Sequence, residues 1–143
     1  MYKIRMAFPL LLALIVAGCS FGPPPSCGDD IGGVADTAVF DTYFNAMALL
    51  NETTGLSGPE GDRGAQFAPG DALAIQADTK SDVEVRACVQ PTSGQSGTIP
   101  FDQTQALSQG QANFPIGSYS PGAYVVRVIV EGTLVKNFPF EIR

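Results

Sequence analysis

Alternation of apolar and polar residues in the second half of the chain limits its fold more than any other feature. Apolar residues hold every second position over residues 73–78 and again over residues 83–90, and the polar segment 79–82 joins the two. Successive side chains of a strand point to opposite faces, so each segment has one core face and one largely polar face. These residues therefore predict two antiparallel strands in a sheet that is solvated on one side.

The last 20 residues predict a hairpin with a substantial core face. Glu131-Gly132 is a two-residue connection between strands over residues 124–130 and 133–142. One face of the first strand and one face of the second carry the apolar side chains Tyr124, Val126, Val128, Val130, Phe138, Phe140 and Ile142. Pro139 lies on the alternate face, and since it has no N–H to donate, it predicts an edge position or a bulge.

Residues 36–52 fit two patterns. Apolar residues recur at helical spacing, with Asp36 placed to cap a helix and Gly55 placed to stop one, yet residues 44–50 also alternate as a strand would. We expect a short helical turn or loop that leads into a strand over residues 43–51. The Gly-rich residues 53–64 predict an exposed loop, and Pro69-Gly70 predicts a turn.

Residues 91–111 are rich in Gly, Ser, Thr and Gln, which bury little apolar surface. We expect mobile loops here, interrupted by a short edge strand at residues 99–101. Phe114 and Ile116 should then return to the core.

The N-terminus has the layout of an export signal. Lys3 and Arg5 precede an uncharged apolar run that is much shorter than the ~20 residues a membrane-spanning helix needs. The run ends in Val16-Ala17-Gly18-Cys19, which resembles the bacterial lipobox. This resemblance implies removal of residues 1–18 and attachment of a diacylglycerol, often with a further acyl chain, to Cys19.

Such a lipid anchor would place the chain in the bacterial envelope. Several acyl chains, at ~0.8 kcal/mol for each buried methylene, hold a protein stably where a single chain would be marginal. Ser20 after the cysteine resembles the pattern that directs lipoproteins to the outer membrane, so we expect the protein there, facing the periplasm or the cell surface. The triple proline within residues 20–26 favours polyproline II and predicts a tether over residues 19–34, followed by one domain over residues 35–143.

Charge and composition exclude several function classes. Without Lys3 and Arg5 the basic residues fall from eight to six against 14 acidic ones, a formal charge of −8, so we expect no binding to nucleic acid. Histidine is absent from the sequence, which removes Ser-His-Asp and Cys-His catalysis and the usual zinc sites. We expect a protein that is not an enzyme and carries no cofactor.

Two cysteines remain once Cys19 carries lipid. Cys27 and Cys88 are an even pair in a compartment that permits disulfides, so pairing is the simpler interpretation and two free thiols the alternative. Alternation places Cys88 opposite the core-facing valines of residues 83–89. A disulfide would therefore fix the start of the domain across the outer face or the edge of a sheet.

The strand and turn residues resemble a known superfamily. Residues 121–128, the Val130-Glu131-Gly132 turn and residues 138–142 resemble the last two strands of immunoglobulin-like and fibronectin-like domains of bacterial envelope proteins. The resemblance covers about residues 43–143 and implies an all-β, immunoglobulin-like antiparallel β-sandwich. It also implies a tyrosine corner, in which the Tyr124 hydroxyl bonds to upstream backbone. Tryptophan is absent and Val126 stands where antibody domains have their second cysteine, so only the wider sandwich superfamily is implied.

The leading functional hypothesis is a non-catalytic lipoprotein that binds or positions another envelope macromolecule, a protein or a polysaccharide. Val125, Arg127 and Ile129 occupy the nominally outward face of their strand and form a candidate partner surface. The alternative is that a loop or the N-terminal segment covers them.

Two other function classes stay open. Glu60, Asp62 and Asp71 lie near glycines and are candidate calcium ligands of an adhesin-like module, as are Asp29 and Asp30, although turn formation explains the same residues. A periplasmic enzyme that uses paired loop carboxylates, such as Asp62, Asp71 and Asp102, or an enzyme inhibitor, is a weaker alternative.

Overall fold

The computed structural model describes Cys27, residues 33–92 and residues 99–143. The predicted export signal, Cys19 and most of the tether lie outside these residues, as do Asp29 and Asp30. The described part contains one short helix, α1 (Thr37–Tyr43), and the strands β1 (Phe44–Asn51), β2 (Glu60–Gly61), β3 (Gly64–Phe67), β4 (Leu73–Thr79), β5 (Val83–Pro91), β6 (Phe101–Leu107), β7 (Gly110–Gly117), β8 (Gly122–Val130) and β9 (Thr133–Ile142).

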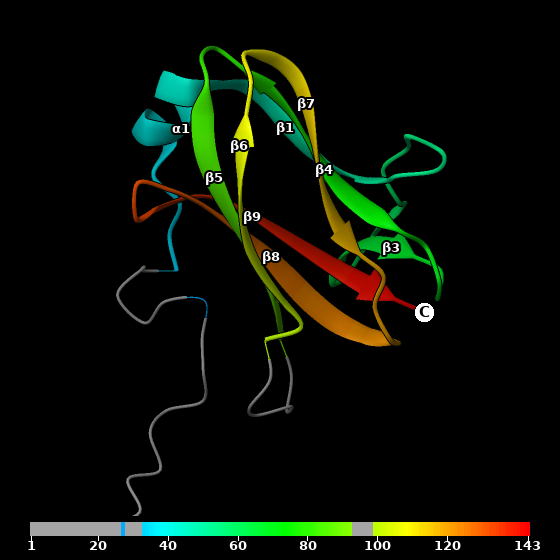
Figure 1. The fold of residues 1–143 in the computed structure, drawn as a ribbon. Coiled ribbons are helices and arrows are strands. Elements are labelled where there is room, and N and C mark those ends of the chain that lie inside the picture. Colours follow the sequence, from blue (N-terminus) through cyan, green and yellow to red (C-terminus); the bar gives the residue numbers. More distant parts are fainter. Residues whose placement is uncertain (1–26, 28–32, 93–98) are drawn as a thin grey trace, which may run out of the picture.

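The strands form two sheets that face each other (Figure 1). One sheet has three strands in the order β1-β4-β7, and the other has six in the order β2-β3-β9-β8-β5-β6. Apolar side chains from both sheets fill the space between them, and Phe44, Leu73, Ile75, Phe114, Val126 and Phe140 are all nearly inaccessible to solvent. The predicted all-β, two-sheet architecture is confirmed.

The ambiguous segment before the first strand contains both predicted elements. The Asp36 carboxylate accepts hydrogen bonds of 3.0 Å from the N–H groups of Ala38 and Val39, which caps α1. The helix ends at Tyr43, and β1 begins at Phe44 and pairs antiparallel with β4. A helical turn that leads directly into a strand explains why both periodicities occur in the sequence.

The strands predicted from alternation are confirmed. In β4 and β5 the predicted core-facing residues are buried, and in β7 Phe114 and Ile116 return to the core with 1 % exposure each. The β8–β9 hairpin turns at Glu131 and Gly132, whose φ angles of 51° and 76° are those of a type I′ connection. The Tyr124 hydroxyl donates to the Ser120 carbonyl at 2.8 Å, the upstream contact that was predicted for this tyrosine.

Pro139 occupies the kind of position that the sequence predicted. The Arg143 N–H donates to the Phe67 carbonyl, so the odd-numbered residues at the end of β9 direct their backbone groups toward β3 and away from β8. β3 pairs with β9 only from Phe140 onward, in parallel, so the missing N–H of Pro139 interrupts no ladder bond. A Cβ on Gly64 would collide with the Pro139 carbonyl, which explains the glycine there.

The prediction of loops between residues 91 and 111 was wrong for its second half. Residues 101–107 form β6, a full strand at the edge of the six-stranded sheet, and residues 60–61 and 64 within another predicted loop also pair as strand residues. Five consecutive residues of β6 are polar or small, so it shows no apolar alternation. An edge strand with its margin in solvent does not need one, because its regularity comes from backbone pairing with β5.

Candidate functional site

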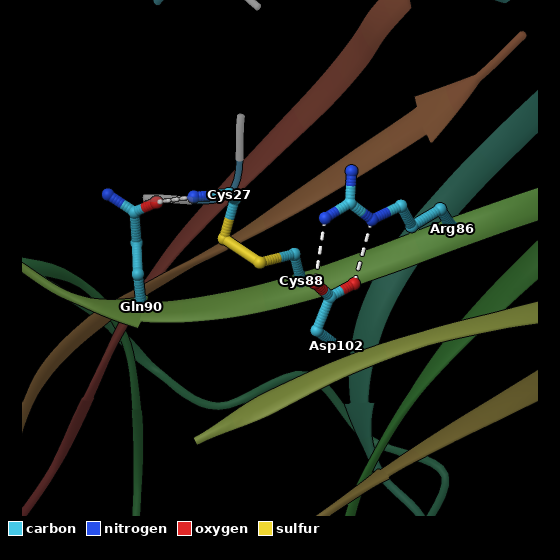
Figure 2. A network of polar contacts seen from close by, with 5 residues as sticks. All are labelled: Cys27, Arg86, Cys88, Gln90 and Asp102. Carbon is cyan, nitrogen blue, oxygen red and sulfur yellow. Dashed lines mark hydrogen bonds and ion pairs between the residues drawn. A yellow bond between two sulfur atoms is a disulfide. The ribbon is translucent and has the colours of Figure 1, made fainter. Parts of the chain in front are cut away.

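The outer face of the six-stranded sheet carries the disulfide. Cys88 lies on β5 and points away from the core, and it bonds Cys27 with a Cα–Cα distance of 5.7 Å. The Cys27 N–H also donates to the Gln90 side-chain oxygen at 3.2 Å (Figure 2). The predicted pairing across the outer face of a sheet is confirmed. Both cysteines are inaccessible to solvent.

Polar residues continue the row that Cys88 begins. The strand registers place Asp102 of β6, Cys88 of β5, Arg127 of β8 and Asn137 of β9 side by side. Arg127 is only 9 % exposed, although it stands on the face that alternation assigns to solvent. This row is therefore partly covered.

The candidate partner surface is not an open surface. Ile129 is 3 % exposed and Arg127 is buried, and only Val125 is half-exposed. The three side chains do share the outer face, as predicted, but the hypothesis that they lie free for a partner is corrected by their burial. The alternative, that another segment covers this face, agrees with the disulfide, which holds Cys27 against β5.

Residues 33–36 lie against β9 and form hydrogen bonds with it. The Asp36 N–H donates to the Leu134 carbonyl at 2.8 Å, and the Asn137 amide donates to the Gly33 carbonyl at 3.2 Å. Lys136 lies 5.7 Å from the ring centres of both Phe40 and Phe138, so its ammonium connects α1 to the same strand. Residues 33–43 thus pack along the first half of β9.

An ion pair lies beside the disulfide on the same face (Figure 2). The Arg86 guanidinium donates two hydrogen bonds of 2.7 Å to the Asp102 carboxylate, a bidentate geometry. These bonds lower the pKa of Asp102 and raise the pKa of Arg86, although partial burial of each group opposes the shift. Each residue sits at an outward position of its strand, but the register that joins them is not readable from the sequence.

This pair predicts a small, pH-dependent contribution to stability. Because the pKa of Asp102 is lowered in the folded state, its contribution is present above the unfolded value of about 4 and is lost as the pH falls through the folded value. Asp102→Asn should lower the free energy of unfolding by less than about 1 kcal/mol at pH 7, since both side chains are 36 % exposed. Urea titration at pH 7 and pH 3 measures the difference, which should shrink at pH 3.

The control for this prediction is Glu84→Gln, which changes an exposed acid on the neighbouring strand. If Asp102→Asn has the same cost at both pH values while Glu84→Gln has none, the ionised pair is not the cause.

The calcium candidates separate into two places. Glu60 and Asp62 line a hollow of about 530 Å³ together with Glu141 and the cations Arg63 and Arg143. Asp71 lies in its own turn, where its carboxylate accepts from the Ala68 N–H at 2.9 Å. Within the described ranges, no group of three or more acidic, Cys or His side chains is arranged to hold a metal ion.

Comparison with protein-family models, with curated proteins and with solved structures finds no match. In the portion of the chain that the structure describes, no helix has the length and apolar character to cross a membrane.

Proposed function

We propose that this chain is a non-catalytic lipoprotein, anchored through Cys19 in the bacterial envelope, whose immunoglobulin-like sandwich binds or positions another envelope macromolecule. The observation that carries the proposal is the buried Cys27–Cys88 disulfide. Disulfides form and persist in oxidising compartments and are rare in the cytosol. This agrees with the export signal that the sequence predicts over residues 1–18, directly before Cys19.

The position of the disulfide also suits a membrane-anchored domain. Eight residue steps separate Cys19 from Cys27, and a fully extended chain covers at most about 3.6 Å for each residue. The lipid would therefore hold β5 within about 30 Å of the membrane surface. A domain kept this close to the bilayer is suited to contact other envelope components.

The strand order supports the immunoglobulin-like assignment. In that fold, strands A, B and E share one sheet and strands C, F and G share the other. The order β1-β4-β7 fits the first set, and the neighbours β5, β8 and β9 fit the second. The bond from Tyr124 to the Ser120 carbonyl fits the tyrosine corner at the start of strand F.

Mass spectrometry of the N-terminal peptide tests the anchor. The full chain, expressed in a bacterium that processes lipoproteins, should begin at Cys19 and carry the mass of a diacylglycerol, with or without a further acyl chain. Cys19→Ser should lack this mass, while Cys27→Ala should keep it because Cys27 lies outside the lipobox. An unmodified thiol at Cys19, or an intact leader, would overturn the proposal.

Site-specific photo-crosslinking in intact cells tests the interaction. Leu56 is an apolar side chain with 67 % exposure in the loop between β1 and β2, and Thr53 is an exposed polar residue of the same loop. A probe in place of Leu56 should capture one envelope macromolecule more strongly than a probe in place of Thr53. Equal background capture at both positions would exclude this loop as the contact surface.

A further inference from the structure

Among the described residues, β6 is the last strand at one edge of the six-stranded sheet, and no further strand pairs with its outer side. The pairing of β5 with β8 shows which residues of β6 direct their backbone groups to the open side. At the end of that pairing, the Thr92 N–H donates to the Ala123 carbonyl at 3.0 Å. Hydrogen bonding alternates along an antiparallel strand, so Gln90 and every second residue before it in β5 direct their backbone groups toward β8. The intervening residues of β5 bond to β6.

This phase identifies the backbone groups at the open edge. The residues of β6 that bond to β5 are Phe101, Gln103, Gln105 and Leu107. Asp102, Thr104 and Ala106 lie between them, so their N–H and C=O groups point away from the sheet. All three residues are exposed, and among the described residues no backbone partner faces these groups.

Natural edge strands usually carry a feature that prevents pairing, such as a proline, a lysine or a bulge. β7, an edge of the other sheet, contains the exposed Pro115. The first half of β9 is covered by residues 33–36, and its second half pairs with β3. β6 has no proline and no basic residue, and its register with β5 is regular over seven pairs.

The residues of β6 are complementary to a second copy of themselves. In an antiparallel pair centred on Thr104, the threonines face each other, Gln103 faces Gln105, and Asp102 faces Ala106. Threonine and amide pairs across strands are favourable, and no like charges oppose each other. The single carboxylate of the strand is already neutralised by Arg86 of its own chain. An acidic protein can thus approach its copy here without direct charge repulsion.

We propose that two copies of this chain associate through β6, edge to edge, and join their six-stranded sheets. The proposal is independent of the lipid anchor, because it rests on the sheet edge alone. One seven-residue strand per copy buries less than the roughly 1,200 Å² of a stable standard interface, so the dimer is weak and reversible. Its population should rise steeply with local concentration.

Cysteine crosslinking of the full chain in cells tests the register. Opposed residues of a bonded antiparallel pair have Cα atoms about 5.5 Å apart, within disulfide reach, so Thr104→Cys should yield a covalent dimer under a mild oxidant. Ala106→Cys is the matched control on the same face, because the two copies of Ala106 would lie about 14 Å apart along the strand. We expect at least about tenfold more dimer from Thr104→Cys.

Equal crosslinking of both variants would indicate random collision and would overturn the proposal. Crosslinking of Thr104→Cys to a different protein would also overturn it and would assign the edge to another partner. The unsubstituted chain measures any background from its own cysteines.

A backbone variant provides a second measurement without an added thiol. Thr104→Pro removes an outward N–H that the ladder with β5 does not use, so the fold should persist. Sedimentation of the detergent-solubilised full chain should show concentration-dependent dimer for the unsubstituted chain and Thr104→Ser, and monomer for Thr104→Pro. Monomer for all three up to millimolar concentration, or undiminished dimer for Thr104→Pro, contradicts pairing through β6.

Discussion

Replacement of both disulfide cysteines, Cys27→Ala with Cys88→Ala, is expected to lower the free energy of unfolding by about 4 kcal/mol at most. The two residues are 61 positions apart, so the crosslink closes a long loop in the unfolded chain and removes much of its conformational entropy. Both sulfurs are buried, and the substitutions also remove their packing against the outer face. Urea denaturation of the two proteins, each with its linear extrapolation, gives the difference.

Gln90→Ala is the matched control for this prediction. It removes the hydrogen bond to the Cys27 N–H but leaves the covalent link intact, so it should cost only about 0.5–1.5 kcal/mol. If the double variant loses no more than Gln90→Ala, the disulfide does not constrain the unfolded chain as proposed.

The second large effect is expected at Phe140, where the two sheets meet. Its side chain is fully buried, stacks on Tyr124 with ring centres 5.3 Å apart, and contacts the rings of Phe67 and Tyr119. Phe140→Ala should lower the free energy of unfolding by about 3–5 kcal/mol, because three aromatic neighbours would surround a cavity that cannot close. Thermal and urea denaturation both measure this loss.

Phe138→Ala provides the comparison within the same strand. Phe138 has the same side chain and faces the same side of β9, but it is only half-buried at the margin of the core. Its replacement should cost clearly less than that of Phe140. Equal costs would show that full burial within the aromatic cluster does not determine the loss of stability at Phe140.

Alternation in the sequence predicted the strands that cross the middle of each sheet. The core-facing valines of β5 and β8 belong to one buried cluster, so burial selects the same alternating pattern that defines the strand. The same alternation placed Cys88 on the outer face, which made the disulfide readable in outline. These predictions succeeded because one side of each strand is buried along its whole length.

Pairing at the sheet margins was not predictable by the same means. β6 has Gln103 and Gln105 where a central strand would have apolar residues. The Gln105 amide instead donates to the Asn113 carbonyl of β7 at 3.4 Å. The parallel contact between β3 and β9 joins residues about 75 positions apart, and only the close approach at Gly64 leaves a trace in the sequence. Local patterns do not encode such distant partners.

The outer face shows why the candidate site was only partly predictable. Alternation correctly placed Val125, Arg127 and Ile129 on one side of β8, but it contains no information on what lies above that side. Ile129 and Arg127 are nevertheless buried, at 3 % and 9 % exposure. The sequence therefore predicts the side of β8 to which these side chains point, but not whether solvent reaches them.

The link between Cys27 and Cys88 also determines how the molecule bears mechanical load. A pull between the two chain ends travels from residue 27 through the sulfurs into β5, and the 60 residues between the cysteines lie outside this covalent path. Helix α1 and strands β1 to β4 therefore cannot be peeled from the N-terminal side one after another. From the N-terminal side, force therefore enters the larger sheet at β5, which pairs with β8 on one edge and with β6 on the other.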